Sequence, residues 1–522
     1  MNKNQRFTTK MALIVALGGF LMGFDASVIS GVVTFIEPEF DLDKIELGWS
    51  VASLTLTATF AMMVAGPLSD KIGRRPVLRI AAVVFAISAI ASALATSFTA
   101  LIVARMIGGL GVGAALIIAP MYIAEISPPA HRGRLVSFNQ LNIVIGISVA
   151  FFTNYIILQL GQSQASWALA LHLEEWNWRW MLGLETLPAV LYFFCLYLVP
   201  ESPRWLVMNN KEDEAFNILC KVSDATQARK DIEVIRNSVR TDGDKDIEQS
   251  TIGDLFKKPM RLVLAIGLTV AVLQQITGIN SVFFYAPMIF EQSGIGTNAS
   301  FMQAILVGLT NLVFTLIAMT LIDRLGRKPI LIFGVSGIAV FMFLLAYSFD
   351  AATYTLSADA IAGLSSGIDQ ALLLPIQDIT FTSDVDFKQA VAEVLGQGSL
   401  QNFESELISA SIAMNPTLIL IGILGFVASF AISIGPVMWV LFAELFPNRI
   451  RGIAISFVGL VNSAVSFLVQ LVFPWELANI GNAGAFFIYG LFAVIGLLII
   501  ARLLPETKGR SLEEIEELLV TA

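Results

Sequence analysis

Three ionisable residues lie inside long apolar runs of the chain: Asp25, Arg105 and Glu185. A charge at the centre of a membrane is costly, so such residues are candidates for function. Asp25 and Arg105 have opposite charges and are expected to pair. A carboxylate in that setting can take up a proton from one side, loosen its hold on the arginine and release the proton to the other side. The alternative is a static ion pair that fixes helix packing, but buried pairs are weak stabilisers, which favours the proton switch.

The second half of the chain offers uncharged hydrogen-bonding groups instead of charges. These groups are Gln274, Gln275, Asn280, Asn311 and Asn462, together with Trp439. Amides both donate and accept hydrogen bonds, and an aromatic face suits the C–H face of a sugar ring. The set therefore predicts a site for a neutral polyol. The alternative is that these amides only join helices, which explains many lone amides in membranes.

Both sets of residues lie in a chain whose composition is typical of a membrane protein. Of its 522 residues, 56% are hydrophobic and 14% are charged, and the mean hydropathy is +0.76. A soluble domain carries about 25% charged residues. Apolar spans of roughly 20 residues, long enough to cross the hydrocarbon core, lie near 11–36, 48–69, 77–97, 99–122, 134–160, 178–199, 260–290, 300–322, 329–349, 412–442, 450–473 and 482–504. We therefore expect an all-α membrane protein with twelve transmembrane helices.

The positive charges predict the orientation of the chain. All but four of the 32 lysines and arginines fall in the two tails, in the even-numbered loops between spans or at the span ends next to them. Positive residues are enriched on the cytoplasmic side, so both termini are expected in the cytoplasm. The exceptions are Arg105 inside a span and Lys44, Arg179 and Lys388 on the opposite side. The first apolar run is longer than a signal-peptide core and holds Asp25, so no cleaved signal peptide is expected.

Two loop patterns occur twice, once in each half of the chain. Residues 70–76 return with similar types at 323–329, and the pattern Glu-x-x-Pro-x-x-x-Arg-Gly at 125–133 returns at 444–452. Repeated loops between apolar runs indicate a duplicated bundle. Simple orienting charge explains the cations but not the repeated Asp and Gly, so we expect cytoplasmic latches that hold the outward-open state. Their residues are Asp70, Arg74, Arg75, Glu125, Arg132, Asp323, Arg327, Glu444 and Arg451.

The repeats also divide the chain into predicted domains. These are an N-terminal six-helix bundle at 1–202, a cytoplasmic helical linker at 203–258, a C-terminal six-helix bundle at 259–505 and a cytoplasmic tail at 506–522. The second half is longer between its repeats because residues 350–411 form an insert on the extracytoplasmic side, with a helix-like stretch at 387–395. The insert could be a lid, a cap that binds a partner, or an unstructured excursion.

Several of these motifs resemble the sugar porter family of the major facilitator superfamily. They are the two repeated loops, Pro200-Glu201-Ser202 and Pro505-Glu506-Thr507 after the last span of each half, and Gln274 to Asn280 in the seventh span. The resemblance covers the whole chain except the insert. It implies the major facilitator fold, with two six-helix bundles and cytoplasmic linker helices.

Within that family the chain is most similar to bacterial sugar–proton symporters, because Gly23-Phe24-Asp25 resembles their first-span motif. Sugar facilitators tend to have a neutral residue at the position of Asp25. By resemblance, Asp25 is the proton acceptor, Arg105 modulates it and Glu185 helps tune the site. The resemblance also adds Gln140 as a substrate ligand from the first half, beside the amides and Trp439 of the second half. It does not assign a particular sugar.

These observations predict a proton-coupled importer of a monosaccharide or related polyol that works by alternating access. A passive sugar facilitator and a non-transporting sugar sensor remain as alternatives. The sequence offers no nucleophile–base set, metal cluster or basic nucleic-acid surface, so we expect no enzyme activity, cofactor, metal or nucleic acid. The expected partners are the neutral sugar or polyol, the proton and the lipid bilayer. We expect a functional monomer that crosses the cell (inner) membrane many times.

Overall fold

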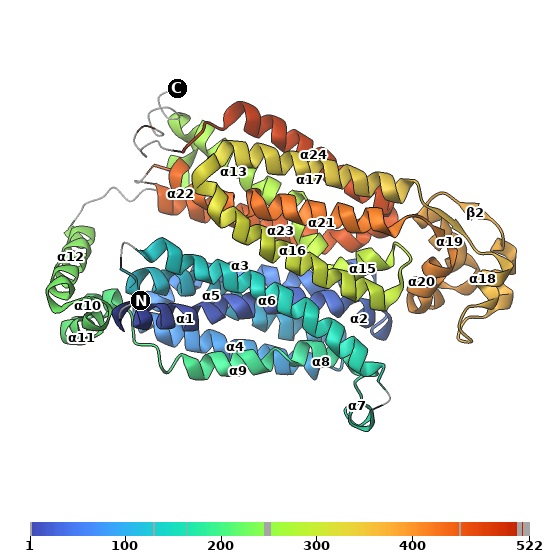
Figure 1. Cartoon of the computed structure of the whole chain (residues 1–522), viewed down its shortest axis with the longest axis horizontal. Coiled ribbons are helices and arrows are strands. Elements are labelled where there is room, and N and C mark those ends of the chain that lie inside the picture. Colours follow the sequence, from blue (N-terminus) through green and yellow to red (C-terminus); the bar gives the residue numbers. More distant parts are fainter. Residues whose placement is uncertain are drawn as a thin grey trace. The chain divides into compact units, whose positions relative to one another are not determined.

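The structure is a computed structural model of the whole chain, and it describes residues 3–128, 131–163, 165–244, 252–447, 450–508 and 514. The described chain is mainly helical and divides into two compact units (Figure 1). Unit 1 holds Met1–Val28, Ser53–Ala150 and Arg179–Gln249. Unit 2 holds Ile29–Ala52, Phe151–Trp178 and Ser250–Ala522.

Unit 1 packs its long helices around an apolar core that includes Phe85, Tyr122 and Tyr192. Its helices are α1 (Lys3–Val28), α4 (Arg74–Ala93), α5 (Phe98–Ile126), α9 (Thr186–Cys195), α10 (Pro203–Met208), α11 (Glu212–Val222) and α12 (Ala225–Asp244). Three further helices have residues in both units, namely α3 (Lys44–Ile72), α6 (Arg132–Gly161) and α8 (Asn177–Gly183). The short helices α10, α11 and α12 share a small core of their own in the predicted linker.

In unit 2, α17 packs against α21 and α24, and α13 packs against α23. The helices of this unit are η1 (Ile29–Gly31), α2 (Val33–Glu39), α7 (Ser166–Ala170), η3 (Ile252–Phe256), η4 (Lys258–Met260), α13 (Arg261–Ile276), α14 (Ile279–Phe284), α15 (Ala286–Glu291), α16 (Gly296–Leu325), α17 (Arg327–Asp350), α21 (Pro416–Ile432), α22 (Ile434–Leu445), α23 (Arg451–Asn479) and α24 (Gly481–Leu503). The helices and strands of the insert complete it.

Eleven helical segments of the described chain are long and apolar enough to cross a membrane. The remaining predicted span, 178–199, consists of α8 and α9, which are separated at Leu184 and Glu185. Pro188 explains the interruption because it has no N–H to donate to the carbonyl of Leu184. The break places Glu185 at a helix start in the middle of an apolar span.

Two spans of the second half are interrupted near residues that break helices. Gly278 separates α13 from α14 with a φ of 87°, and an added Cβ would lie 2.4 Å from the ring of Tyr489. Glycine is needed there for both reasons. Ser433 separates α21 from α22, shortly before Pro436. Interrupted helices of this kind often line the binding sites of carriers.

The insert between α17 and α21 is folded. Three short strands form an antiparallel sheet in the order β2-β1-β3, with bounds Thr353–Thr355 for β1, Thr380–Phe381 for β2 and Ile412–Ala413 for β3. The sheet packs with α18 (Ala358–Ala362), η5 (Gln370–Ile376), α19 (Asp384–Leu395) and α20 (Gln397–Ser411). Tyr354, Phe387 and Leu407 are buried in its core. The predicted helical stretch at 387–395 is part of α19, and Figure 1 shows the insert beyond α15 at one end of unit 2.

Candidate functional site

A buried ion pair joins α1 and α5 in unit 1. Arg105 Nη1 lies 2.8 Å from Asp25 Oδ1 and 3.4 Å from the backbone oxygen of Asp25. Both side chains are only 2% exposed. Removal of one partner of such a buried pair is costly, because the charge of the other partner is then left uncompensated. The structure therefore brings together the two residues that the sequence predicts to pair.

The pair leaves buried polar atoms unused. Asp25 Oδ2, Arg105 Nε and Glu185 Oε1 have no hydrogen-bond partner in the described part of the chain. Glu185 is also 2% exposed, and it interacts electrostatically with both Asp25 and Arg105. An unpaired carboxylate oxygen in a dry site is an available position for a proton, because protonation removes a buried charge.

Gly108 makes room for the Asp25 carboxylate. An added Cβ at Gly108 would lie 3.0 Å from Asp25 Oδ2 and 2.5 Å from Ser88 Oγ. Ser88 Oγ itself donates to the carbonyl of Ala104 at 2.8 Å. Gly108 was missed by the sequence reasoning, although it follows Arg105 by three positions on one helix and so shares its face.

Three helices of unit 2 meet at a network of amides. Gln275 Nε2 donates to Gln274 Oε1 and to Asn462 Oδ1, both at 3.2 Å, and Gln275 Oε1 accepts from Asn280 Nδ2 at 2.8 Å. Asn462 Nδ2 donates to Gln274 Oε1 and to the carbonyl of Ala271, both at 2.8 Å. The network joins α13, α14 and α23 and contains four of the predicted substrate ligands.

The hydrogen bonds of this network use up most of its donors. An amide nitrogen has two hydrogens, and those of Gln275, Asn280 and Asn462 are each donated to two protein acceptors. A carbonyl oxygen has two lone pairs, so the side-chain oxygens of these three residues can each accept at least one more hydrogen bond. The network therefore offers mainly acceptors, which suits the hydroxyl hydrogens of a sugar.

Two residues that sequence reasoning missed extend the network along α23. Ser466 Oγ accepts from Asn280 Nδ2 and from Gln470 Nε2, both at 2.7 Å. The backbone carbonyl of Gln470 accepts from the hydroxyl of Tyr285 at 3.1 Å. Ser466 and Gln470 follow Asn462 at intervals of four residues and so lie on the same helix face. That spacing is the sequence signal that identifies them.

Three predicted ligands lie outside the network. Asn311 on α16 is buried at 6% exposed, without a hydrogen bond to the network in the described residues. Trp439 on α22 is 50% exposed and lies one turn after Gly435, whose carbonyl accepts from Gln274 at 3.4 Å. Gln140 is exposed on α6 in unit 1. The roles of all seven residues as ligands stay predictions.

The first loop repeat forms a charged network in unit 1. Arg74 donates to both oxygens of Glu125, at 3.1 Å from Nε and 3.0 Å from Nη2, and its Nη1 lies 2.8 Å from Asp70 Oδ1. Glu201 accepts the backbone N–H of Arg74 at the start of α4, where the helix dipole favours an anion. Ser202 Oγ also donates to Glu125. The residues after span six thus complete this network.

The second loop repeat forms the same arrangement in unit 2. Arg327 Nη2 lies 2.7 Å from Glu444 Oε1, and Thr507 Oγ1 donates to Glu444 Oε2 at 2.7 Å. Glu506 accepts the backbone N–H of Arg327 at 3.0 Å, at the start of α17. The same residue types therefore produce the same contacts in both halves.

A glycine with positive φ precedes the arginine in each copy. The φ angle is 103° at Gly73 and 96° at Gly326. An added Cβ would lie 2.4 Å from Glu201 Oε2 in the first copy and 2.7 Å from Glu506 Oε2 in the second. Glycine is therefore required both for the backbone turn and for the approach of the carboxylate.

Four predicted latch residues lie outside these ion pairs or have a side chain outside the described part of the structure. Arg75 and Arg451 donate from their guanidinium groups to backbone carbonyls. Arg132 is exposed and makes no ion pair in the described residues, and the side chain of Asp323 lies outside the described part of the structure. Each observed ion pair joins helices within one unit. The latch roles of all nine residues stay predictions.

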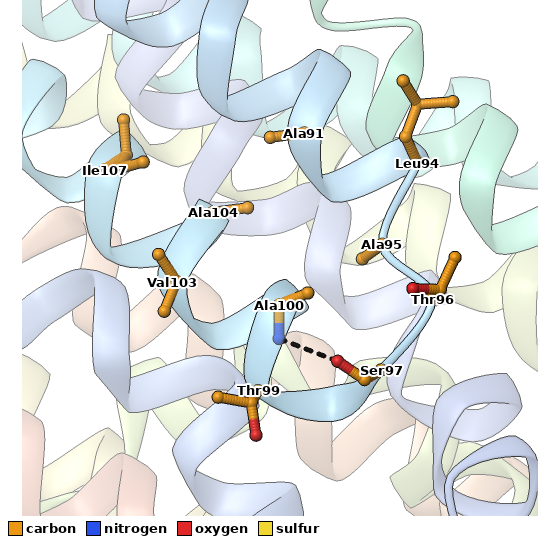
Figure 2. A pocket seen from close by; sticks show the side chains of 10 residues that line it. All are labelled: Ala91, Leu94, Ala95, Thr96, Ser97, Thr99, Ala100, Val103, Ala104 and Ile107. Atoms are coloured by element: carbon orange, nitrogen blue, oxygen red, sulfur yellow. Dashed lines mark hydrogen bonds between the residues drawn. The ribbon is translucent and has the colours of Figure 1, made fainter.

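A surface hollow of about 500 Å³ lies between the end of α4 and the start of α5 in unit 1 (Figure 2). Its lining is mostly aliphatic, with Leu94, Val103 and Ile107 among its side chains. The hydroxyl of Ser97 is occupied by the backbone N–H of Ala100, at 3.3 Å. No ionisable side chain lines the hollow, so the ion pair and the amide network remain the candidate site.

The sequence profile described as "Sugar (and other) transporter" matches residues 11–366 and 404–519. The chain belongs to the sugar transporter family. This finding confirms the predicted relationship to the sugar porters. The chain is therefore a transporter and not an enzyme. The profile leaves residues 367–403, which lie within the insert, unmatched.

Two bacterial members of the sugar transporter family match nearly the whole chain. The arabinose-proton symporter of Bacillus subtilis (strain 168) is 34% identical over 518 residues, covering 98% of this chain and 95% of the relative. The D-xylose-proton symporter of Escherichia coli (strain K12) is 34% identical over 547 residues, covering 99% and 96%.

Solved structures of a xylose transporter share the fold. The inward-open conformation of XylE from E. coli aligns with a TM-score of 0.73 at 31% identity, covering 98% of this chain and 100% of that chain. Its partially occluded inward-open conformation gives a TM-score of 0.71 at 32% identity, covering 97% and 100%. These structures confirm the predicted major facilitator fold with twelve transmembrane helices.

Proposed function

We propose that this sugar transporter imports a monosaccharide or related polyol together with a proton, by alternating access. The observation that carries the proposal is the buried Asp25–Arg105 pair, with an Asp25 oxygen that has no partner in the described residues. A passive facilitator needs no such titratable group in a dry span. The names of the two bacterial relatives, both sugar–proton symporters, support the same conclusion.

The proton binds to the free oxygen of Asp25 when the site faces outward. Protonation makes the carboxyl neutral and weakens its attraction to Arg105, so α1 and α5 lose a contact that holds them together. Glu185 interacts electrostatically with both Asp25 and Arg105. It therefore tunes the balance between the paired and separated states of these two residues. When the site faces the cytoplasm the proton leaves, and the ion pair forms again.

The sugar binds to the amide network of unit 2. Gln275, Asn280 and Asn462 offer fixed acceptor oxygens to its hydroxyl groups. The oxygen of Gln274 already accepts two hydrogen bonds, so Gln274 offers the second hydrogen of its amide nitrogen instead. The remaining proposed ligands are Asn311, Gln140 and the half-exposed indole of Trp439. Because the network is already hydrogen-bonded without sugar, binding costs little additional ordering of side chains.

The repeated charge networks act as latches on the cytoplasmic side. Arg74–Glu125 and Arg327–Glu444 are the central contacts of the two copies. They hold the helix ends of each half in one arrangement while the carrier faces outward. In this proposal both termini are cytoplasmic, the protein crosses the cell membrane, a monomer is sufficient for transport, and the domain bounds are those predicted from the repeats.

The test uses purified protein in proteoliposomes with labelled xylose, arabinose and glucose. An inward proton gradient should drive accumulation of at least one sugar by the wild type, with alkalinisation outside. Asp25→Asn should abolish accumulation and alkalinisation but keep sugar exchange between equal concentrations, because Asn resembles the protonated carboxyl. Equal accumulation by both proteins would contradict the proton role, and sugar binding without flux in the wild type would favour a sensor.

A further inference from the structure

The insert carries a charged cluster that the proposed transport site does not use. Lys388 Nζ on α19 lies 2.8 Å from Glu404 Oε1 on α20, and Glu404 Oε2 lies 3.8 Å from Nζ of Lys44 at the start of α3. Lys44 also pairs with Glu37 on α2. The four side chains are only 10–21% exposed. The cluster therefore links the insert to the loop between spans one and two.

Two amide side chains take part in this cluster, one beside the ion pairs and one across to the loop. Gln292, just after α15, accepts from Lys388 Nζ at 2.7 Å and donates to Glu404 Oε1 at 3.0 Å. Gln401 Nε2 on α20 donates to the carbonyl of Leu42 at 3.3 Å. The contact with the loop thus consists of an ion pair and a hydrogen bond from α20, while Lys388 of α19 and Gln292 hold the Glu404 carboxylate in place. It is therefore more than one surface ion pair, which would contribute little.

The placement of the lysines supports a specific role. Positive residues are rare on the extracytoplasmic side of this chain, yet two of the three predicted there, Lys44 and Lys388, converge on Glu404. A lysine in the first turn of a helix is unfavourable, because the positive end of the helix dipole lies there. Neither orientation in the membrane nor helix formation explains Lys44, whereas pairing with Glu37 and Glu404 does.

The loop that the insert contacts belongs by sequence to the N-terminal half, and the insert belongs to the C-terminal half. Alternating access requires the outer ends of the two halves to separate whenever the site opens outward, so this inference rests on the proposed function. We propose that the insert is an extracytoplasmic clamp, in which Glu404 and Lys388 hold Lys44 and Glu37 and oppose outward opening. The family profile leaves residues 367–403 unmatched, so Lys388 lies outside the matched part of the chain, whereas Glu37, Lys44 and Glu404 lie inside it.

A distance measurement tests the clamp directly. Spin labels are attached at Ile45→Cys on α3 and Gln389→Cys on α19, both exposed positions, after Cys195 and Cys220 are replaced by serine. Pulsed electron paramagnetic resonance should give one narrow distance distribution in the otherwise unchanged chain. Glu404→Gln and Lys44→Met should each add a longer component. Glu393→Gln, the same change at an exposed position of α19, is the matched control and should add none.

The double variant Lys44→Met/Glu404→Gln is the control for loss of folding in the single variants. It removes one charge of each sign, so the cluster stays neutral, and its distribution should resemble those of the single variants instead of broadening further. Distributions that match the unchanged chain in all three variants would overturn the clamp. This readout needs no sugar flux, so it decides the clamp even if the proposed function fails.

Transport kinetics provide the second readout. If the clamp lowers the outward-facing fraction, Glu404→Gln should lower the KM for external sugar by about fivefold and raise the KM for internal sugar. Simple loss of folded protein lowers the maximal rate in both directions and leaves both KM values unchanged. Unchanged KM values in a variant that still transports would contradict the clamp. Absence of any sugar flux in the wild type would instead contradict the proposed function.

Discussion

The two halves of this sugar transporter have the same charged loop networks but different polar cores. Arg74–Glu125 in unit 1 and Arg327–Glu444 in unit 2 are built from equivalent residues with equivalent backbone contacts. Within the spans, unit 1 has a charged pair with unused atoms, whereas unit 2 has amides whose donors are largely used. In the proposed function this difference separates two tasks, since a proton needs a group with two charge states and a sugar needs fixed neutral acceptors.

The largest expected effect comes from breaking the amide network at its centre. Gln275→Ala removes hydrogen bonds to Gln274, Asn280 and Asn462 at once, and each buried group left unpaired costs about 1–3 kcal/mol. We expect sugar affinity to fall on the order of 100-fold, which corresponds to about 2.7 kcal/mol. Isothermal titration of the detergent-solubilised protein with sugar measures this change.

Thr269→Ala on the same helix is the matched control, because the exposed Thr269 hydroxyl donates to the carbonyl of Ala265 in its own helix. It should leave sugar affinity unchanged. Asp25→Asn should also keep the affinity within about threefold, because protonation does not alter the acceptors of unit 2. If Asp25→Asn lost affinity as strongly as Gln275→Ala, the separation of tasks between the halves would be wrong.

A smaller effect is expected from adding one methyl group beside Asp25. Gly108→Ala places a Cβ close to Asp25 Oδ2 and Ser88 Oγ, so the Asp25 carboxylate must move from its observed position. We expect about a tenfold fall in proton-driven accumulation, with sugar affinity little changed. Gly66→Ala is the control, since an added Cβ there meets nothing within 4 Å. Equal loss in the two variants would indicate general damage instead of an effect on Asp25.

The sequence was sufficient to predict the twelve spans, the paired loops and the Asp25–Arg105 contact. Opposite charges inside apolar spans have few alternatives to pairing, and helix breakers such as Gly278 mark interruptions by their own stereochemistry. The sequence could not predict that Glu201 and Glu506 would cap helix starts, because those contacts join segments far apart in the chain. It also left the fold of the insert open, since its short strands and helices form through tertiary contacts.

A modest effect tests whether the two charged loop networks are equivalent. Ser202→Ala and Thr507→Ala each remove a hydrogen bond to the central glutamate of one copy, worth about 1 kcal/mol. Ser202→Ala also removes the cap of α10, because Ser202 Oγ accepts the N–H of Trp205 at 3.3 Å. We expect Thr507→Ala to lower the Tm by about 2 °C and Ser202→Ala to lower it by about 4 °C. The controls are Ser137→Ala and Thr320→Ala, whose hydroxyls are exposed and bond to their own helix. A fall in Tm in only one of the two variants would show that the two networks contribute unequally to stability, although their geometry is the same.

The smallest expected effect concerns pH, and it separates the clamp from the proton site. Burial alone would raise the pKa of Glu404, but the ammonium groups of Lys388 and Lys44 outweigh it, so this pKa lies well below its ordinary value of 4.5. A lowered pKa means that the stabilisation by Glu404 is fully present above the ordinary value and is lost only as the pH falls through the lower, folded value. The difference in Tm between wild type and Glu404→Gln should therefore stay constant from pH 7 to pH 5.

Any change of transport between pH 7 and pH 5 should then come from unit 1 and persist in Glu404→Gln. Other acidic groups near Glu404 are Glu37 and Glu291, and burial raises the pKa of Glu291 to about 8. A Tm difference that grows as the pH falls from 8 to 6 would assign the titration to Glu291, because protonation of Glu291 removes its repulsion with Glu404, which weakens only the wild type at the higher pH. That result would place a second pH-dependent group in unit 2 and remove the clean division between a proton-handling half and a neutral one.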